Sequence, residues 1–481
     1  MSRFPNPIRL TILAVGLTLA RFGLVDRERV HRTVDLAWPR ILTGLARMSK
    51  SSVDIAMVGI AVGPAAIAGI GLAGPFWGIA FTIGSGLATG TIALVSQRYG
   101  AGAYDKLGQA IRSSVFLVLV VSLPIAAVLA TFSAELIGLL TDDRGSIEQG
   151  AAYLAIVAFG VPFAGLNLVG GRILIGVDDA WTPMLLRGGG AVANIAINAV
   201  LIFGLGMGVV GAAMGTVLSN VAVTAAFATG LVAGRLPLVG AFPVQVTARG
   251  RYVHRETIGD LIRISLPVIG RNGVWTGARF PMLAFVAMFG QHVVAAYVIS
   301  RRIWGLMNTP GWGFGLAASS LVGQSLGEED ETAAESYGHE IMRIAVVTYA
   351  IAATVVFVFA EPIVNLFVEE GAAETVPVAV ALTHAACLAV IARGIGGTYA
   401  GALDATGDTR WPFYSRALGM FGVAIPMTYL GATTALGLWG LYLSYFGQSV
   451  IPAVVNRYRF STGKWKAISR QYRPGSTAAD D

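Results

Sequence analysis

Cysteine and charge are both scarce in this sequence. Cys387 is the one cysteine among 481 residues, so the chain can form neither an intramolecular disulfide nor a cysteine-based metal cluster. The five histidines are scattered and show no HExxH or His/Cys metal-site spacing. The sequence also lacks a Walker motif, so ATP is not the expected energy source. Charged residues make up 13% of the chain, whereas a soluble domain carries about 25%. These absences argue against a disulfide scaffold, a metalloenzyme, an ATPase and a soluble domain.

Hydrophobic residues, in contrast, make up 55% of the chain, and the mean hydropathy is +0.68. Apolar segments recur along the whole sequence, and most of them exceed the ~20 residues that a helix needs to cross a bilayer. We therefore predict an all-α integral membrane protein. Twelve spans are expected, at approximately 34–60, 65–97, 107–132, 148–175, 183–204, 208–233, 258–289, 291–325, 336–360, 375–403, 412–431 and 436–458.

The distribution of basic residues predicts the orientation of these spans. The net charge is +7, but the basic residues lie in short loops beside apolar runs, which indicates topology rather than a nucleic-acid partner. The loops after even-numbered spans are basic, whereas those after odd-numbered spans hold one basic residue, Arg144. Both termini are therefore expected in the cytoplasm of a cell-membrane protein. The acidic stretch 327–335, GEEDETAAE, is the exception to this pattern.

The two halves of the chain also resemble each other. LVSQRYGAG returns as LVGQSLGEE at an offset of 227 residues, and DDAWTP and GVVGAA return as GDTRWP and GLWGLY at an offset of 229. Such weak internal repeats are typical of transporter folds. We predict two six-helix lobes related by a pseudo-two-fold axis along the membrane normal. The expected organisation is an interfacial or cytoplasmic N-terminal segment, an N-terminal lobe, a cytoplasmic linker, a C-terminal lobe and a cytoplasmic tail, at 1–33, 34–233, 234–257, 258–460 and 461–481.

Asp54 is the one carboxylate in the stretch 39–59 of the predicted first span. Ionised Asp near the bilayer centre costs roughly 2.5 to 3.5 kcal/mol, so such residues usually face a cavity, a partner or an ion. Asn194 and Asn198 share one helical face of segment 5, and Thr216 in segment 6 adds a hydroxyl. Their oxygens suit a hard cation. The alternatives are hydrogen bonds between helices for the asparagines, a backbone bond for Thr216 and a helix-end charge for Asp54.

Aromatic residues and arginines in segments 2, 7 and 8 are candidates for a substrate cleft. Aromatic faces suit flat lipophilic cations, although packing against lipid is the alternative role for most of them. Arginines within segments 7 and 8 would instead suit an anionic or phosphate-bearing substrate. The candidate cleft residues are Trp77, Trp275, Tyr297, Arg302 and Trp304.

Two short motifs resemble enzyme signatures but lack the required context. GIGLAG at 69–74 matches GxGxxG, and GQSLG at 323–327 matches GxSxG, yet no strand precedes either motif. Paired acids, metal ligands and catalytic triads are also missing from the segments. We therefore expect a protein that is not an enzyme.

Several longer stretches carry a resemblance to a known family. They are PRI and VDIAMVG in the first span, GAGAYDKL, TPM, NIAINAVLIFG, GVVGAAMGT and AAYVISRRIWGLMNTPGWGFGLAASSLVGQSLG. Over residues 34–460 the chain resembles the multidrug and toxic compound extrusion (MATE) family, part of the multidrug/oligosaccharidyl-lipid/polysaccharide flippase superfamily.

This resemblance implies a cation site in the N-terminal lobe. Asp54, Asn194 and Thr216 match coupling positions of the archaeal-type branch, whereas Asn198 replaces a second acid of that branch. The departure removes one titratable group and leaves the stoichiometry open. Another branch carries acids in helices 7 and 10, but this chain has Trp275, His384 and Arg393 there.

The implied function is secondary active efflux. The resemblance implies export of amphipathic or cationic organic compounds in exchange for H⁺ or Na⁺ by alternating access, with Na⁺ held at Asp54, Asn194, Asn198 and Thr216. A small-molecule substrate and the lipid bilayer are the expected partners, the chain is expected to be a monomer, and no cofactor is expected. The alternative is a flippase or exporter of a lipid-linked or polyprenyl-linked substrate.

Overall fold

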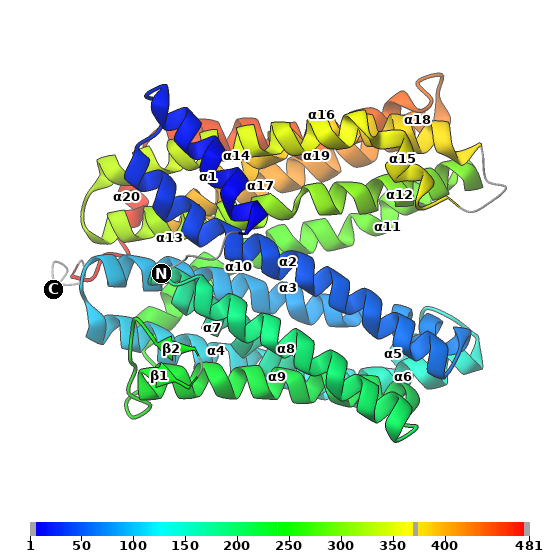
Figure 1. Ribbon diagram of the computed structural model, residues 1–481, viewed down its shortest axis with the longest axis horizontal. Helices are drawn as coiled ribbons and strands as arrows, with labels where there is room; N and C mark the ends of the chain where they lie inside the picture. Colours follow the sequence, from blue (N-terminus) through cyan, green and yellow to red (C-terminus); the bar gives the residue numbers. More distant parts are fainter. Residues whose placement is uncertain (1–5, 238, 369–373, 476–481) are drawn as a thin grey trace. The chain divides into compact units, whose positions relative to one another are not determined.

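The protein is described here from a computed structural model, which describes residues 6–237, 239–368 and 374–475 (Figure 1). The regular elements of the described residues are helices, except for one short antiparallel pair, β1 (Arg235–Leu236) and β2 (Gly240–Ala241), in which Arg235 pairs with Ala241. The predicted all-α architecture is thus confirmed. The first five residues of the predicted N-terminal segment and the last six of the predicted tail lie outside the described residues.

The chain forms two compact units. Unit 1 comprises residues 1–41 and 270–481, and unit 2 comprises residues 42–269. Two helices, α2 (Arg27–Ala61) and α10 (Arg255–Gly277), contribute residues to both units. The predicted linker 234–257 lies within unit 2, where β1 and β2 form its only described strands.

Unit 2 is built around α3 (Pro64–Gly100), which packs against α4, α6 and α7. Small residues allow this close packing: a Cβ added to Gly69 of α3 would lie 2.5 Å from the backbone nitrogen of Gly150 in α6. The other elements of this unit are α4 (Tyr104–Thr131), α5 (Ser133–Gly138), α6 (Arg144–Ala158), α7 (Val161–Gly176), α8 (Trp181–Ala199), the π-helix η1 (Val200–Gly204) and α9 (Gly208–Ala233).

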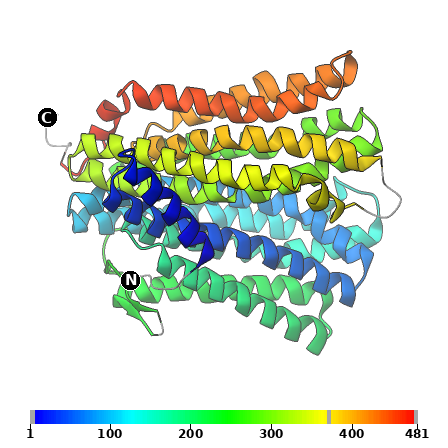
Figure 2. The ribbon, with the colours of Figure 1, turned by 45° about the horizontal axis from the view of Figure 1, so that its top comes forward.

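Unit 1 is organised in the same way around α16 (Thr375–Ala405), which packs against α12, α13, α14 and α19 (Figure 2). A Cβ on Gly401 of α16 would lie 2.0 Å from the carbonyl oxygen of Gly315. The remaining elements are α1 (Pro7–Arg21), α11 (Arg279–Ala287), α12 (Gln291–Met307), α13 (Thr309–Gly327), α14 (Glu331–Val358), α15 (Ala360–Asn365), α17 (Arg410–Ala417), the π-helix η2 (Leu418–Ala424), α18 (Ile425–Thr433), α19 (Trp439–Ser461) and α20 (Trp465–Arg470).

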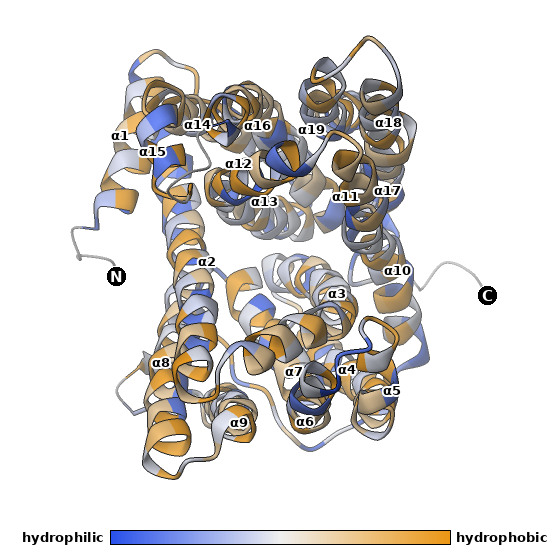
Figure 3. Cartoon of the chain, turned by 90° about the vertical axis from the view of Figure 1, so that its right-hand side faces the viewer, coloured by the Kyte–Doolittle hydropathy of each residue, from blue (hydrophilic) through white to orange (hydrophobic). Residues whose placement is uncertain are grey.

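Among the described residues, six helices are long and apolar enough to cross a membrane, or up to seven if the bent pair α6 and α7 forms one span. They correspond to the predicted segments 65–97, 107–132, 183–204, 208–233, 336–360 and 375–403, with 148–175 as the bent pair. Large apolar side chains are exposed along α8 and α9, for example Val192 and Leu218, as expected for contact with lipid. Hydrophobic residues colour much of both helices in Figure 3. The chain is therefore a multi-pass membrane protein. The other five predicted spans, including 34–60, do not pass this test, so the number twelve stays a prediction.

The internal repeat extends to the backbone conformation. Left-handed residues recur in pairs at the offsets found in the sequence: Gly63 with Gly290 and Gly102 with Glu329 at 227 residues, and Asp178 with Gly407, Gly208 with Gly437 and Gly234 with Gly463 at 229. The φ angles within a pair agree closely, for example +65° for Gly102 and +64° for Glu329. Non-glycine residues rarely adopt this conformation. The turns between helices are therefore duplicated along with the sequence.

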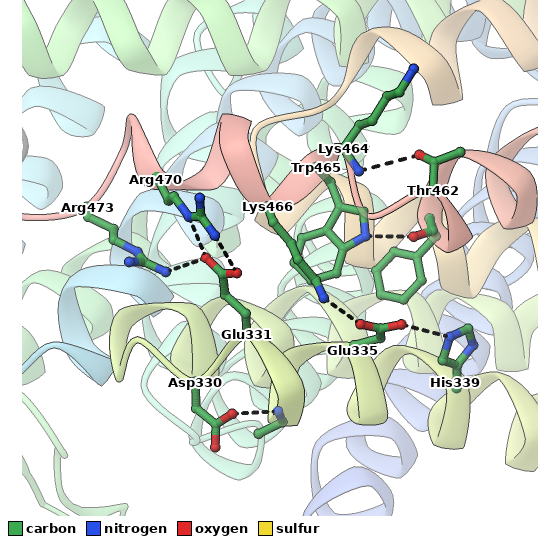
Figure 4. A network of polar contacts seen from close by, with 12 residues as sticks. Asp330, Glu331, Glu335, His339, Thr462, Lys464, Trp465, Lys466, Arg470 and Arg473 are labelled. Atoms are coloured by element: carbon green, nitrogen blue, oxygen red, sulfur yellow. Dashed lines mark hydrogen bonds and ion pairs between the residues drawn. The ribbon is translucent and has the colours of Figure 1, made fainter.

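Two of the five acids in the stretch 327–335 form ion pairs with the C-terminal tail. Glu331 accepts hydrogen bonds from Arg470 at 2.7 and 2.8 Å and from Arg473 at 2.9 Å (Figure 4). Glu335 accepts one from Lys466 at 2.6 Å. The exception to the basic-loop pattern thus has a local cause, because the counter-charges come from the tail of the same unit.

Candidate functional site

Helix α2 places two charged side chains on one face of unit 2. Lys50 and Asp54 are four residues apart, which brings their side chains together on a helix. The ammonium Nζ of Lys50 donates to Oδ2 of Asp54 at 2.7 Å, and their side chains are 22% and 21% exposed. Val53 and Ile55, the neighbours of Asp54 in the sequence, are exposed apolar residues. The acid therefore has a cationic partner in its own helix.

The second carboxylate oxygen of Asp54 contacts the asparagine pair of α8. Nδ2 of Asn198 donates to Oδ1 of Asp54 at 2.9 Å and lies 3.3 Å from Oδ1 of Asn194. Nδ2 of Asn194 donates in turn to Oγ of Ser219 at 3.3 Å and to Oγ1 of Thr216 at 3.5 Å, both in α9. The structure thus brings Asp54, Asn194, Asn198 and Thr216 into one hydrogen-bonded chain, as the sequence-based hypothesis requires. Their role in cation coupling stays a prediction.

One side-chain oxygen in this hydrogen-bonded group accepts no hydrogen bond from the described residues. Asn198 is fully buried, and its Oδ1 forms no hydrogen bond with a described residue. The backbone of α9 approaches it closely, because a Cβ added to Gly215 would lie 1.9 Å from that oxygen. Tyr153 of α6 also faces the cluster, where its hydroxyl interacts with Thr216 and with the charge of Asp54. The acid cluster is the name used below for eight residues, namely Lys50, Asp54, Tyr153, Asn194, Asn198, Gly215, Thr216 and Ser219.

Sequence reasoning missed four members of the acid cluster. Lys50 had a readable signal, since Lys-x-x-x-Asp inside an apolar helix places the two charges one turn apart. Ser219 lies three residues after Thr216 and shares its face of α9. Gly215 and Tyr153 gave no signal, because one acts through the absence of a side chain and the other comes from α6, far away in sequence.

The candidate cleft residues fall into separate places. Trp275 of α10 and Trp304 of α12 stack with ring centroids 5.3 Å apart, and Arg301 lies 5.0 Å from each ring. Tyr297 is buried beside Tyr445, with ring centroids 6.4 Å apart. Arg302 is exposed on α12, and it is its neighbour Arg301 that contacts the tryptophans. These residues all belong to unit 1.

Trp77 belongs to unit 2. It lines a small apolar pocket together with Phe81, Val161, Gly165 and Leu168. The guanidinium of Arg47 lies 4.5 Å from the Phe81 ring centroid. The structure therefore brings Trp275 and Trp304 together, whereas Trp77 lies in the other unit.

The acid cluster offers oxygen and nitrogen groups suited to a small cation or a proton. A carboxylate, an unpartnered amide oxygen and two hydroxyls lie within one hydrogen-bonded chain. In the part of the chain that the structure describes, no three Asp, Glu, His or Cys side chains group as a metal site would require. The acid cluster therefore offers one carboxylate, Asp54, for a positive charge, and Lys50 already contacts it.

Curated proteins of similar length match most of this chain. The probable multidrug resistance protein YoeA of Bacillus subtilis is 25% identical over 448 residues, covering 90% of this chain and 94% of its own. The multidrug resistance protein PmpM of Pseudomonas aeruginosa is 27% identical over 462 residues, covering 91% and 92%. The probable multidrug resistance protein NorM of Bradyrhizobium diazoefficiens is 26% identical, covering 86% and 89%.

Solved structures share the fold. A MOP superfamily transporter from Pyrococcus furiosus, described as having a binding pocket of reversed polarity, gives a TM-score of 0.83 at 22% identity and covers 92% of this chain and 96% of its own. A multidrug resistance MATE family transporter in an outward-facing conformation gives 0.82 at 23% identity, covering 90% and 96%. The MatE family model matches residues 39–200 and 267–430, one stretch in each half of the internal repeat, and with these matches the chain belongs to the MatE family.

Proposed function

We propose that this chain is a secondary active multidrug exporter that moves amphipathic or cationic organic compounds out of the cell in exchange for a cation at Asp54. The names of the curated relatives support export of drug-like compounds. The observation that carries the coupling site is the bond from Asn198 to Asp54, which links α2 to α8 through the one carboxylate of the stretch 39–59. Asn194 and Thr216 extend that link to α9.

Lys50 favours H⁺ over Na⁺ as the coupling ion. Its ammonium already donates to Asp54 at 2.7 Å, so a Na⁺ ion would have to approach the carboxylate against a full positive charge. A proton is opposed by the same charge, but it adds to the carboxylate itself and needs neither room nor a ligand shell. Na⁺ at Asp54, Asn194, Asn198 and Thr216 is the alternative arrangement.

The driving force depends on the charge of the exported compound. One positive charge that moves inward down the membrane potential supplies about 2.3 kcal/mol per 100 mV, which is available for export of an uncharged compound. Exchange of one proton for one monovalent cation moves no net charge, so the pH gradient must drive it. Either source of free energy drives a substrate outward if proton and substrate compete for one alternating-access cycle. We infer twelve spans in two lobes related by an axis along the membrane normal, which the duplicated turns support. We also infer a monomer in the cell membrane with both termini in the cytoplasm and no cofactor.

Export of a fluorescent lipophilic cation tests this proposal. Ethidium efflux from proteoliposomes would be followed under an imposed pH or Na⁺ gradient, with native protein and Asp54→Asn. We expect efflux driven by the pH gradient, and at least a tenfold loss in Asp54→Asn because the variant cannot exchange a proton. Asp142→Asn, which removes an exposed loop acid, should behave as native.

Gradient-driven efflux at the native rate in Asp54→Asn would refute the coupling site. Efflux driven by Na⁺ and not by H⁺ would refute the argument from Lys50. Absence of cation efflux under both gradients would favour the second candidate, a flippase or exporter of lipid-linked or polyprenyl-linked substrates, which the arginines around Trp275 support because guanidinium groups bind phosphate.

A further inference from the structure

Three guanidinium groups surround one indole ring in unit 1. The guanidinium carbons of Arg301, Arg416 and Arg393 lie 5.0, 5.3 and 5.7 Å from the ring centroid of Trp275. Because 5.3 and 5.7 Å are the two longest of these distances, any two of the guanidinium carbons lie at most about 11 Å apart. The three arginines come from α12, α17 and α16, so three helices each place a positive charge beside Trp275 of α10. We call these four residues the arginine cluster.

Within the described part of the chain, no carboxylate forms an ion pair with the arginine cluster. None of its three arginines forms an ion pair with a described residue: Arg301 donates to the Gln448 amide at 3.2 Å, and Arg393 donates to Oδ1 of Asn308 at 3.3 Å. Asp404 lies on the same face of α16 as Arg393 but is engaged elsewhere, since Arg271 donates to both of its oxygens at 3.0 and 2.8 Å. The cluster therefore keeps three net positive charges inside a membrane protein, where charges are costly unless they serve a ligand or a partner.

Hydrogen-bond donors of this region also lack acceptors. Nη1 of Arg393, Nη1 of Arg416 and Nε1 of Trp304 are buried and form no hydrogen bond with a described residue. The Arg416 side chain as a whole is buried, with its residue only 7% exposed. Buried donors without a partner are rare in native proteins, and each one calls for an explanation. These three donors lie beside three positive guanidinium groups. One negatively charged group with several acceptor oxygens could accept hydrogen bonds from all three donors and also balance the charge.

We propose that the arginine cluster binds the anionic head of an amphipathic ligand, namely a carboxylate, sulfonate or phosphate attached to an aromatic or aliphatic body. The guanidinium forks match oxyanions bidentately, and the stacked rings of Trp275 and Trp304 supply apolar surface beside the charge. One turn after Arg393 on the same face of α16, Gly397 has open space, because a Cβ there would meet no atom within 4 Å. The site goes beyond cation export and lies in the unit that does not hold the acid cluster.

Equilibrium binding tests this proposal without any gradient, so its outcome does not depend on the transport reaction. Protein purified in a non-ionic detergent would be titrated calorimetrically with 2-naphthalenesulfonate and, in parallel, with the cation 2-naphthylmethylammonium. We expect binding of the sulfonate and at least tenfold weaker binding of the cation. Arg416→Gln and Arg393→Gln should each weaken sulfonate binding at least tenfold, because each removes a charged donor.

Arg302→Gln is the matched control. It removes the same charge from an exposed position on α12, one residue from Arg301, and should leave the sulfonate affinity within twofold of native. Trp304→Phe retains a ring but removes the unpartnered N–H, so a several-fold loss is expected even if an arginine variant fails to fold. Each variant would first be checked for a monodisperse elution profile and native thermal stability.

A second arm separates a free organic anion from a lipid headgroup. Protein in nanodiscs of phosphatidylcholine, with or without 20% phosphatidylglycerol, would be titrated with the same sulfonate. Competition by phosphatidylglycerol that is lost in Arg416→Gln assigns the site to a lipid phosphate, and no competition assigns it to a free anion. The proposal is overturned if native protein binds neither anion, if it binds the cation equally well, or if Arg302→Gln weakens binding as much as Arg416→Gln does.

Discussion

Asp54 differs from an isolated intramembrane carboxylate because its counter-ion is built into the same helix. Lys50 lies one turn earlier, and the remaining carboxylate oxygen is held by Asn198. The pair is about one-fifth exposed, so its energetic value is smaller than that of a dry ion pair. Removing either partner would leave the other charge uncompensated, and this asymmetry makes both residues informative targets.

Replacing Lys50 should change the ion that drives transport. In Lys50→Met the carboxylate loses its fixed cation but keeps the amide and hydroxyl oxygens nearby, so the cluster becomes able to accept Na⁺. We expect Na⁺-driven ethidium efflux to rise at least fivefold relative to native protein at pH 8, measured in proteoliposomes. Lys106→Met, which removes a lysine from the first turn of α4, serves as the control. An unchanged response to both gradients would show that Lys50 does not select the ion.

Gly215 should be needed for the position of Asn198. A methyl group at this residue would lie 1.9 Å from Oδ1 of Asn198, so Gly215→Ala forces the amide away from Asp54. Hydrogen bonds to a charged group are worth about 1.5 to 3 kcal/mol, which corresponds to roughly a tenfold or greater loss of coupled efflux. The overall fold should tolerate the change, because the contact is with a side-chain amide that can rotate.

Gly189→Ala in α8 is the control for that prediction. A Cβ at Gly189 would meet no atom within 4 Å, so the same chemical change should leave efflux at the native level. Thermal stability of both variants would be compared in detergent. If Gly215→Ala transports as well as Gly189→Ala, the contact between Asn198 and Asp54 is not required for coupling.

The residues that sequence reasoning identified share one property, which is that each is unusual where it occurs. A carboxylate in an apolar span and asparagines at a spacing of four attract notice in any membrane helix. What the sequence could not provide was the partners contributed by distant helices. The three arginines around Trp275 come from α12, α16 and α17, and nothing in their spacing indicates that they converge on α10. Sequence reasoning also selected Arg302 for the cleft, whereas its neighbour Arg301 contacts the tryptophans. Neighbouring residues on a helix point about 100° apart, so an error of one position selects a different face.

At the scale of elements, the C-terminal helix α20 is anchored more firmly than its length suggests. Trp465 is fully buried, stacks on Phe460 with ring centroids 5.0 Å apart, and donates its indole N–H to the Phe460 carbonyl at 2.7 Å. The charged contacts to Glu331 and Glu335 surround this apolar centre (Figure 4). Six residues cannot form a stable helix alone. The anchoring tryptophan must therefore supply most of the stability of α20.

Trp465→Ala should accordingly destabilise the protein by about 3 to 5 kcal/mol, the range for truncating a buried Trp. Trp439→Ala is the matched control, because Trp439 is 66% exposed and its loss should change stability little. Thermal unfolding followed by tryptophan fluorescence in detergent measures both variants. Equal melting temperatures for the two would contradict the anchoring role of Trp465.

Breaks within helices are a second feature of the elements that the sequence did not predict. Apolar length predicted α3, α4, α9, α14 and α16 well, because a long uninterrupted helix is what the hydrophobic criterion detects. The predicted span 148–175 is bent by 51° between α6 and α7, and the predicted span 291–325 is divided at Asn308 between α12 and α13. Breaks of this kind depend on packing against neighbouring helices.

At the scale of the whole molecule, the contacts of the tail bear on topology. Glu331 in the acidic stretch contacts Arg470 and Arg473, so the loop before α14 and the C-terminal tail must lie at the same membrane face. Arg29, near the start of α2, donates to Glu340 at 2.7 Å and joins the same end of unit 1. Acidic residues contribute little to orientation, so the basic tail and N-terminal arginines decide the side. All three segments are therefore expected in the cytoplasm.

Cysteine labelling makes this orientation measurable, because Cys387 is buried and the chain has no other cysteine. In a Cys387→Ala background, exposed positions would be changed one at a time to cysteine at Lys464, Glu328 and Asp142. A membrane-impermeant maleimide should label Asp142→Cys in intact cells, and should label Lys464→Cys and Glu328→Cys only after permeabilisation. Labelling of Lys464→Cys from outside would invert the orientation and place the basic loops against the positive-inside rule. Labelling of Glu328→Cys and Lys464→Cys from opposite sides would be incompatible with the ion pairs between Glu331 and the tail, since a single membrane face must hold both partners.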